Sequence, residues 1–87
     1  MSASYSLKII TPQGVVYKGT TVHTLVPVEN GFAGILANHA PYLVSSNGGK
    51  VTTREQNGVE RIFQVGPGVF EVHQNEAVFL TQSCQKL

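Results

Sequence analysis

Apolar and polar residues alternate along most of this chain with a period of two. Tyr5, Leu7 and Ile9 alternate with Ser6 and Lys8, a pattern typical of a strand with one buried face. Every window of eleven or more residues either lacks a convincing helical apolar period or contains Gly or Pro. We therefore predict no substantial helix. The segments predicted to be strands are 5–9, 15–18, 20–26, 32–36, 42–44, 50–55, 59–65, 69–73 and 77–81.

Turn signals separate these segments at intervals of about eight to twelve residues, which is typical of a β-sandwich or flattened barrel. Gly19 is expected to end the second strand, and Pro27 to stop pairing at the end of the third. Gly34, Pro41, Gly66 and Gly68 are expected to be structural turn residues, the last two where the chain crosses between sheets. The turns predicted are 11–14, 29–31, 46–49, 56–58, 66–68 and 74–76.

We predict one all-β domain over residues 1–87, with residues 1–4 loose and residues 83–87 a C-terminal tail. Strict alternation places Thr21 and Thr24 on opposite faces of their strand. The five carboxylates are interpreted as solvated strand faces: Glu29, Glu55, Glu60, Glu71 and Glu76. Phe63, Phe70 and Phe79 are predicted to lie in the core.

Charged residues make up only 13% of the chain, about half the average of roughly 25% for soluble domains. So few charges on a small domain indicate that a partner covers part of the surface. The net charge is +1 and no basic cluster is present, so the electrostatic footprint of a nucleic-acid-binding protein is missing.

No pattern of catalytic, metal-binding or cofactor-binding residues emerges. His23, His39 and His73 are not within metal-ligand spacing of one another. The serines lack the context of a nucleophile elbow, and Cys84 is interpreted as a frayed thiol near the C-terminus. We predict no catalytic residue, no metal and no cofactor.

The stretch from Pro27 to Pro41 differs from the strands around it, because it combines a turn, a short apolar run and a small-residue corner. Phe32 follows the turn, and it is either a core aromatic or an exposed anchor for a partner. His39 is either a corner histidine whose ring bonds to backbone groups or a contact at an interface. The sequence leaves both alternatives open.

Three motifs in this chain resemble the epsilon subunit of rotary F-type ATP synthases. The run GFAGILANHAP is similar to the family's Gly-x-x-Gly-Ile-Leu-Pro-Asn-His-Ala-Pro signature. Thr11-Pro12 with Gly14 resembles its first turn, and VGPGVFEV resembles its Val-x-Gly-Gly-Phe-x-Glu-Val segment. The resemblance covers about residues 5–82. Departures from the family pattern occur at Phe32, Ala37, Gly48 and Pro67.

The resemblance implies a flattened antiparallel β-barrel or sandwich of about ten short strands. It also implies a non-catalytic rotor subunit in the central stalk, which couples the gamma subunit to the membrane c ring during proton-driven ATP synthesis. Such a subunit lies peripherally at the cytoplasmic face of the bacterial inner or plasma membrane, as part of F1. Carried over by position, the c-ring contact residues are Glu29, Asn30, Gly31 and Phe32. The gamma contact residues are Thr11, His39, Ala40 and Val44.

Many members of this family continue into a two-helix C-terminal domain, whereas this chain stops at Leu87. Met1 favours a naturally short member over a fragment. An alternative function is a small β-barrel module that binds single-stranded nucleic acid or carbohydrate. That function needs a basic groove lined with aromatic side chains.

Overall fold

The structure is a computed structural model that describes residues 3–87. All regular structure in this range is β-strand, and it forms one continuous sheet of nine strands. The strands are β1 (Tyr5–Thr11), β2 (Gly14–Val28), β3 (Gly31–Leu36), β4 (Tyr42–Ser46), β5 (Gly49–Glu55), β6 (Glu60–Val65), β7 (Gly68–His73), β8 (Glu76–Thr81) and β9 (Cys84–Lys86). Residues 1 and 2 of the segment predicted to be loose lie outside the described residues, and residues 3 and 4 precede β1 without strand structure.

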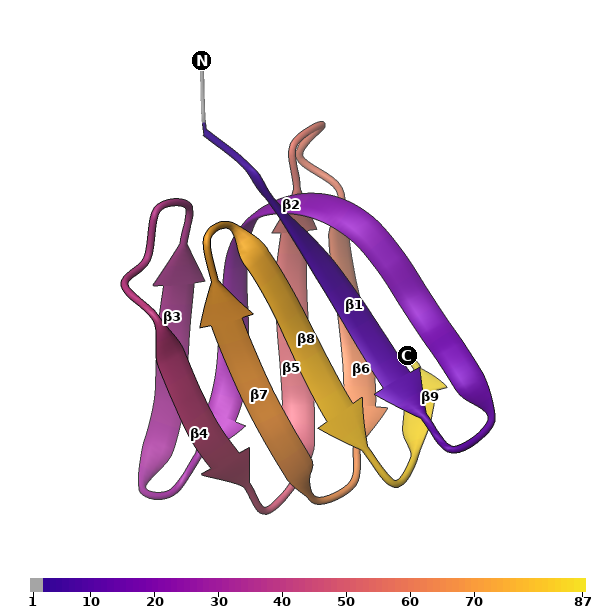
Figure 1. The fold of residues 1–87 in the computed structure, drawn as a ribbon. Helices are drawn as coiled ribbons and strands as arrows, with labels where there is room; N and C mark the ends of the chain where they lie inside the picture. The colour runs from indigo at the N-terminus through magenta and orange to yellow at the C-terminus, as the bar shows by residue number, and fades with distance from the viewer. Residues whose placement is uncertain (1–2) are drawn as a thin grey trace.

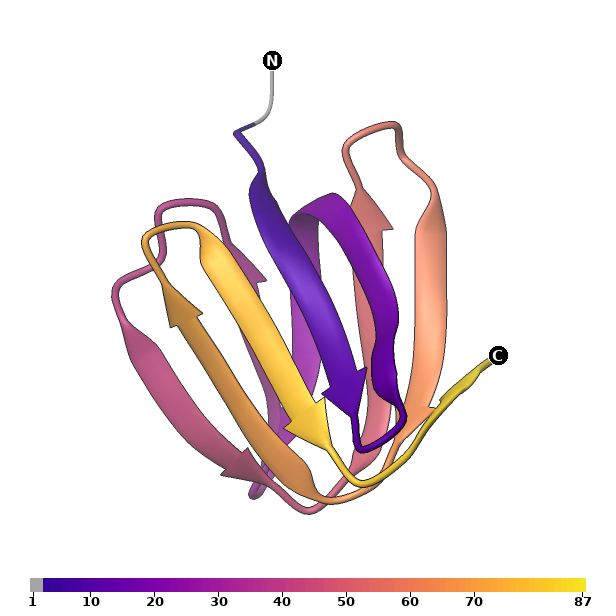
Figure 2. The same cartoon turned by 45° about the vertical axis from the view of Figure 1, so that its right-hand side comes forward.

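The sheet folds on itself into two layers (Figures 1 and 2). The front layer of Figure 1 contains β4, β7, β8, β1 and the first part of β2. The back layer contains β3, the second part of β2, β5, β6 and β9. The prediction of an all-β sandwich is therefore confirmed. The sheet is mixed rather than purely antiparallel, because β1 and β8 pair in parallel.

Strand β2 is continuous over fifteen residues, so the prediction that Gly19 interrupts it was wrong. Gly19 pairs with Leu7 inside the strand, and a Cβ there would collide with the Tyr17 side chain. The small residue therefore leaves room for the aromatic ring and does not break the strand. Pro27 stops pairing on one edge only: the pairing with β5 ends at Leu25, whereas Pro27 still pairs with Phe32 on β3.

A β-bulge in β2 places Thr21 and Thr24 on the same side, against the prediction from strict alternation. The pairing of β2 with β5 shifts register between Thr21 and His23. The extra residue of a bulge inverts the inside-outside pattern beyond it and bends the strand. Both threonines are fully buried as a result, together with Thr53 of β5.

The tight turns follow the sequence prediction. Gln74 and Asn75 connect β7 to β8 and have φ values of 50° and 61°, as a type I′ hairpin turn requires. Gly66 and Pro67 carry the chain from β6 in the back layer to β7 in the front layer, as predicted. Gly68 has a steric role, because a Cβ there would collide with the carbonyl oxygen of Leu80.

Of the remaining predicted turn residues, Pro41 lies in the corner between β3 and β4 as expected. The prediction for Gly34 was wrong, because it lies inside β3 and pairs with Leu25. A glycine within a short edge strand weakens it without ending the hydrogen-bonded ladder.

The core lies between the two layers and forms one cluster. Phe63, Phe70 and Phe79 are almost completely buried in it, which confirms the prediction for these three aromatics. These three rings are therefore not available to stack with the bases of a single-stranded nucleic acid.

The last residues form strand β9 instead of the predicted free tail. Cys84 pairs with Val65 and Lys86 pairs with Phe63, so β9 covers the outer edge of β6. The Cys84 thiol is partly buried against the core, and this burial raises its pKa. This pairing matters because an uncovered strand edge readily pairs with another strand.

Candidate binding surfaces

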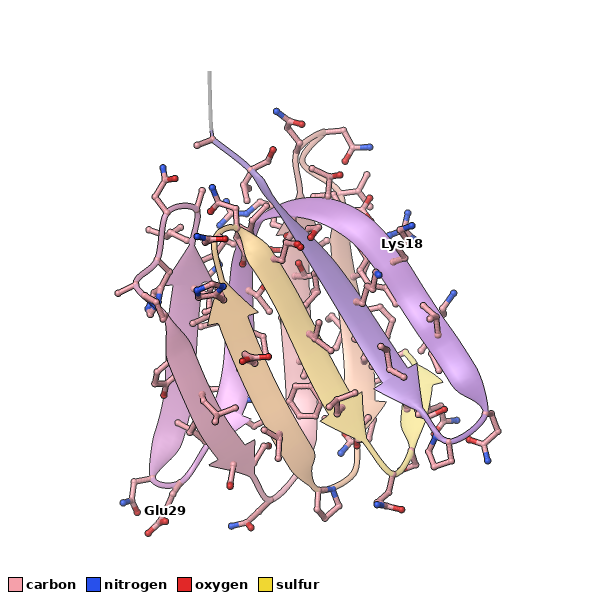
Figure 3. The ribbon with its side chains drawn as sticks, viewed as in Figure 1. Lys18 and Glu29 are labelled. Carbon is pink, nitrogen blue, oxygen red and sulfur yellow. The ribbon has the colours of Figure 1, made fainter. Side chains whose placement is uncertain are left out.

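The hairpin between β2 and β3 presents Glu29, Asn30, Gly31 and Phe32 to solvent. Its turn begins after Val28, which pairs with Gly31, and Asn30 has the left-handed φ of 68° that such a tight turn favours. The Phe32 side chain is 61% exposed, so Phe32 is not a core residue. The four predicted c-ring contact residues are thus together at one end of the molecule, near the Glu29 label in Figure 3.

The corner between β3 and β4 holds His39 and Ala40. The Nδ1 atom of His39 lies 2.6 Å from the carbonyl oxygen of Ala40, so the ring donates a hydrogen bond to its own corner. The His39 ring also packs near Tyr42, with 5.6 Å between ring centroids. The side chain therefore stabilises the corner locally, while Ala40 stays exposed and available for contact.

The hairpin tip and the corner lie at opposite ends of β3, and therefore at opposite ends of the sandwich (Figure 1). The molecule is elongated, with principal extents of 34 × 23 × 21 Å. Two partners could occupy these two ends at the same time without competing for space.

The side chains of Thr11 and Val44, two of the predicted gamma contact residues, point inward. Thr11 is buried, and its hydroxyl donates to Oε1 of Gln13 across the turn at 3.1 Å. Val44 is paired with the fully buried Phe70 and packs against the core. In both strands the neighbouring residue faces solvent instead, since successive side chains alternate between the faces of a sheet.

The outer face of the front layer carries an apolar row that the sequence analysis did not identify. Strand pairing aligns Val69 of β7 with Leu80 of β8, Leu80 with Ile10 of β1, and Ile10 with Val15 of β2. Val15 and Leu80 are 57% and 51% exposed. Val69 and Leu80 also line a shallow groove that continues to Pro12 and Pro67. We call the four aligned residues, Val69, Leu80, Ile10 and Val15, the apolar row.

A second row lies beside the apolar row on the same face. Strand pairing aligns Leu43, Glu71 and Val78 with Lys8 and Lys18. Leu43 is the most exposed large apolar side chain of the described residues, at 68%. The acidic residue lies on the β7 side of the face and the two lysines lie on the β1 and β2 side, where Figure 3 labels Lys18. This separation of charge would orient a partner bound to the apolar row.

Polar residues at one end of the back layer form a small cluster with a different role. The hydroxyl of Tyr17 donates to Oε2 of Glu55 at 2.6 Å, and Nε of Arg61 donates to the same oxygen at 2.7 Å. These two bonds hold the pKa of Glu55 below its ordinary value. Glu55 was predicted to lie on a solvated face, but it links three strands, and we interpret the cluster as structural.

Residues 3–87 contain no group of three or more His, Cys, Asp or Glu side chains that could hold a metal ion. Within the same residues, no helix is long and apolar enough to cross a membrane. The features that stand out are instead the exposed hairpin tip and the apolar row. Such features are typical of small β-sandwich domains that bind other proteins through exposed apolar surface.

Comparison with known proteins identifies the family. The family model described as "ATP synthase, Delta/Epsilon chain, beta-sandwich domain" matches residues 4–86. An ATP synthase epsilon chain of Chlorobaculum tepidum is 35% identical over 79 residues, which cover 91% of this chain and 90% of the relative. This chain belongs to the delta/epsilon family of ATP synthase β-sandwich domains.

Some other relatives are longer than this chain. An ATP synthase epsilon chain of Dichelobacter nodosus is 28% identical over 86 residues, and the match covers 99% of this chain but 60% of the relative. The fold also matches a chain in the cryo-EM structure of the Euglena gracilis mitochondrial ATP synthase with a TM-score of 0.90 and 14% identity. That match covers 99% of this chain and 55% of the other, and it concerns the fold alone.

Proposed function

We propose that this chain is a non-catalytic rotor subunit in the central stalk of an F-type ATP synthase. It couples the gamma subunit to the membrane c ring during proton-driven ATP synthesis. The relatives named ATP synthase epsilon chain and the family match over nearly the whole chain support this proposal. A second match in fold, with a TM-score of 0.76 and 16% identity, comes from a structure of the Tetrahymena thermophila ATP synthase central stalk and c ring.

The gamma subunit, in this proposal, binds across the outer face of the front layer. The observation that carries this step is the apolar row. Of the predicted gamma contact residues, Thr11 follows Ile10 of the row at the end of β1, and Val44 is on β4 at the edge of the same layer. The corner at His39 and Ala40 precedes β4, at the other end of this layer from the row. Exposed apolar side chains that are contiguous across four strands are costly in water and mark a surface that another protein covers.

The c ring, in this proposal, is contacted by the hairpin tip from Glu29 to Phe32. Phe32 supplies an apolar anchor and Glu29 a charge that stays at the rim of the contact. The domain then lies peripherally at the cytoplasmic face of a bacterial inner or plasma membrane, as part of F1. The bacterial sources of the matched relatives support this location.

The proposal is tested by co-expression with the gamma subunit from the same genome. We expect a complex of one gamma subunit with one copy of this chain that survives size-exclusion chromatography. Leu80→Asp places a charge in the middle of the apolar row, and it should abolish the complex because a buried, unpaired carboxylate is strongly unfavourable. Ile62→Asp is the matched control, since Ile62 is 36% exposed on the back layer.

The proposed function fails if the wild-type chain forms no stoichiometric complex with gamma. The placement of gamma on the front layer fails separately, if Leu80→Asp and Ile62→Asp weaken the complex equally. Circular dichroism of both variants establishes that they are folded.

A further inference from the structure

Two asparagine side chains connect the corner at His39 to a turn that is distant in sequence. The backbone N–H of Asn38 donates to Oδ1 of Asn75 at 2.7 Å. The Nδ2 of Asn75 donates to Oδ1 of Asn38 at 3.0 Å. The β3–β4 corner and the β7–β8 turn lie side by side at the same end of the molecule in both ribbon views (Figures 1 and 2). We call this pair of bonds the asparagine clasp.

Backbone conformation alone does not explain why both positions hold asparagine. Asn38 and Asn75 have left-handed φ values of 64° and 61°. Glycine adopts this conformation more easily than asparagine does. Asparagine adds a side-chain amide with one acceptor oxygen and two donor hydrogens, and here both amides are used across the clasp.

The β7–β8 turn is a rigid base for the clasp. The carbonyl oxygen of Asn75 accepts a hydrogen bond from the backbone N–H of Ser6 at 3.0 Å, which ties the turn to β1. The turn is closed by the pair His73 and Glu76, the last of the β7–β8 ladder.

The corner is supported locally by the His39 ring and by Ala37, which packs against the core, but it has no strand pairing. Residues 37–41 lie between the end of β3 and the start of β4, outside the strand pairing of residues 3–87. The clasp joins this corner to the turn between β7 and β8 through two hydrogen bonds.

We propose that the asparagine clasp holds the corner in the orientation that binds the gamma subunit. Asn75 is then a positioning residue: it acts through Asn38 on His39 and Ala40. This inference rests on the proposed function, because it assigns the clasp to the same gamma-binding face. Without the clasp, the corner samples several orientations, and binding must first select the competent one.

Asn75→Gly and Asn38→Gly test the clasp, because both keep the left-handed backbone and remove the amide. The affinity for the purified gamma subunit is measured by isothermal titration calorimetry on the full chain. Each variant should weaken binding about five- to tenfold, as expected for the loss of one or two exposed hydrogen bonds. Asn75→Gly removes both bonds, whereas Asn38→Gly removes only the bond from Nδ2 of Asn75 and keeps the one from the Asn38 backbone N–H. The double variant should therefore bind as weakly as Asn75→Gly and no more weakly.

Gln74→Gly is the matched control. Gln74 is in the same two-residue turn, with a φ of 50°, and its side chain makes no hydrogen bond within residues 3–87. This variant adds the same flexibility to the unfolded chain and keeps the clasp, so its affinity should equal that of the wild type. Amide hydrogen exchange at His39 and Ala40 should accelerate in Asn75→Gly and not in Gln74→Gly.

Wild-type affinity in Asn75→Gly would overturn the clasp and leave the proposed function intact. An equal loss in Gln74→Gly and Asn75→Gly would also overturn it, because the effect would then come from the turn. If the wild-type chain does not bind gamma, the proposed function fails and this inference fails with it. Should Asn75→Gly not fold, Asn75→Asp retains the acceptor for the Asn38 N–H, and intermediate affinity is expected.

Discussion

At the scale of single residues, several side chains have roles that their neighbours in sequence do not reveal. The buried hydroxyl of Tyr5 donates to the carbonyl oxygen of Ile35 at 2.8 Å and so connects the two layers. Burial raises the pKa of this tyrosine to about 12, so it stays neutral at physiological pH. Glu55 accepts two hydrogen bonds on one carboxylate oxygen, although its sequence pattern predicts a polar, solvated strand face.

Glu55 makes the stability of the domain depend on pH. Arg61 and Tyr17 lower the pKa of its carboxyl in the folded state. Because the pKa of Glu55 is lower in the folded than in the unfolded state, the ionised carboxylate stabilises the fold at pH values above its pKa in the unfolded chain. This stabilisation is lost as the pH falls through the pKa of Glu55 in the folded state. The urea midpoint of the wild type should therefore exceed that of Glu55→Gln at about pH 7, and the difference should shrink towards about pH 3.

Glu60→Gln is the control for this measurement. Glu60 is exposed on β6 and makes no ion pair within residues 3–87. Its substitution should leave the midpoint unchanged at neutral pH. A difference between the wild type and Glu55→Gln that stays constant over the whole pH range would contradict the role assigned to Glu55.

At the scale of elements, strand β2 determines the architecture. It spans fifteen residues and belongs to both layers, and its bulge turns Thr21 and Thr24 into the same interior. There they meet Thr53 of β5, whose hydroxyl also donates to the carbonyl oxygen of His23 at 3.2 Å. No buried side-chain nitrogen or oxygen among the described residues lacks a hydrogen-bond partner. The bend is thus stabilised by a fully satisfied polar cluster, which tolerates the loss of a member poorly.

Thr53→Val tests this cluster, because valine has nearly the same shape but no hydroxyl. We expect a loss of about 1–2 kcal/mol in the free energy of unfolding, since buried partners lose a hydrogen bond. Thr52→Val on the outer face of the same strand is the control, with an expected change within about 0.5 kcal/mol. Urea unfolding monitored by circular dichroism measures both, and equal effects would contradict the role of the cluster.

At the scale of the whole molecule, the proposed contacts are on different layers of the sandwich. The hairpin tip joins β2 to β3 in the back layer (Figure 1), and the apolar row crosses the outer face of the front layer near the ends of β1 and β8. A domain placed between a stalk and a ring needs such an arrangement, because torque passes through it only if both contacts are made at once. The continuous sheet and single core make it a rigid connector.

This separation predicts that the two contacts can be removed independently. Phe32→Asp should weaken sedimentation of the complex of gamma and this chain with purified c rings, while the fold and gamma binding stay intact. Val59→Asp is the matched control, because Val59 is 42% exposed in the connection between β5 and β6, outside both proposed contacts. Loss of folding in Phe32→Asp would contradict its exposed position, and loss of gamma binding would contradict the separation.

The sequence by itself determined most strands, most turns, the core phenylalanines and the position of the hairpin tip, because these depend on local alternation and on Asn, Gly and Pro. Whether Phe32 is buried or exposed was decided only by the tertiary structure. Only the tertiary structure decided the parallel pairing of β1 with β8, the bulge in β2, and the pairing of β9 with β6. The apolar row and the asparagine clasp also join residues from distant strands, so no local window contains them. Long-range register brings them together, and it is fixed when the whole sheet closes around its core.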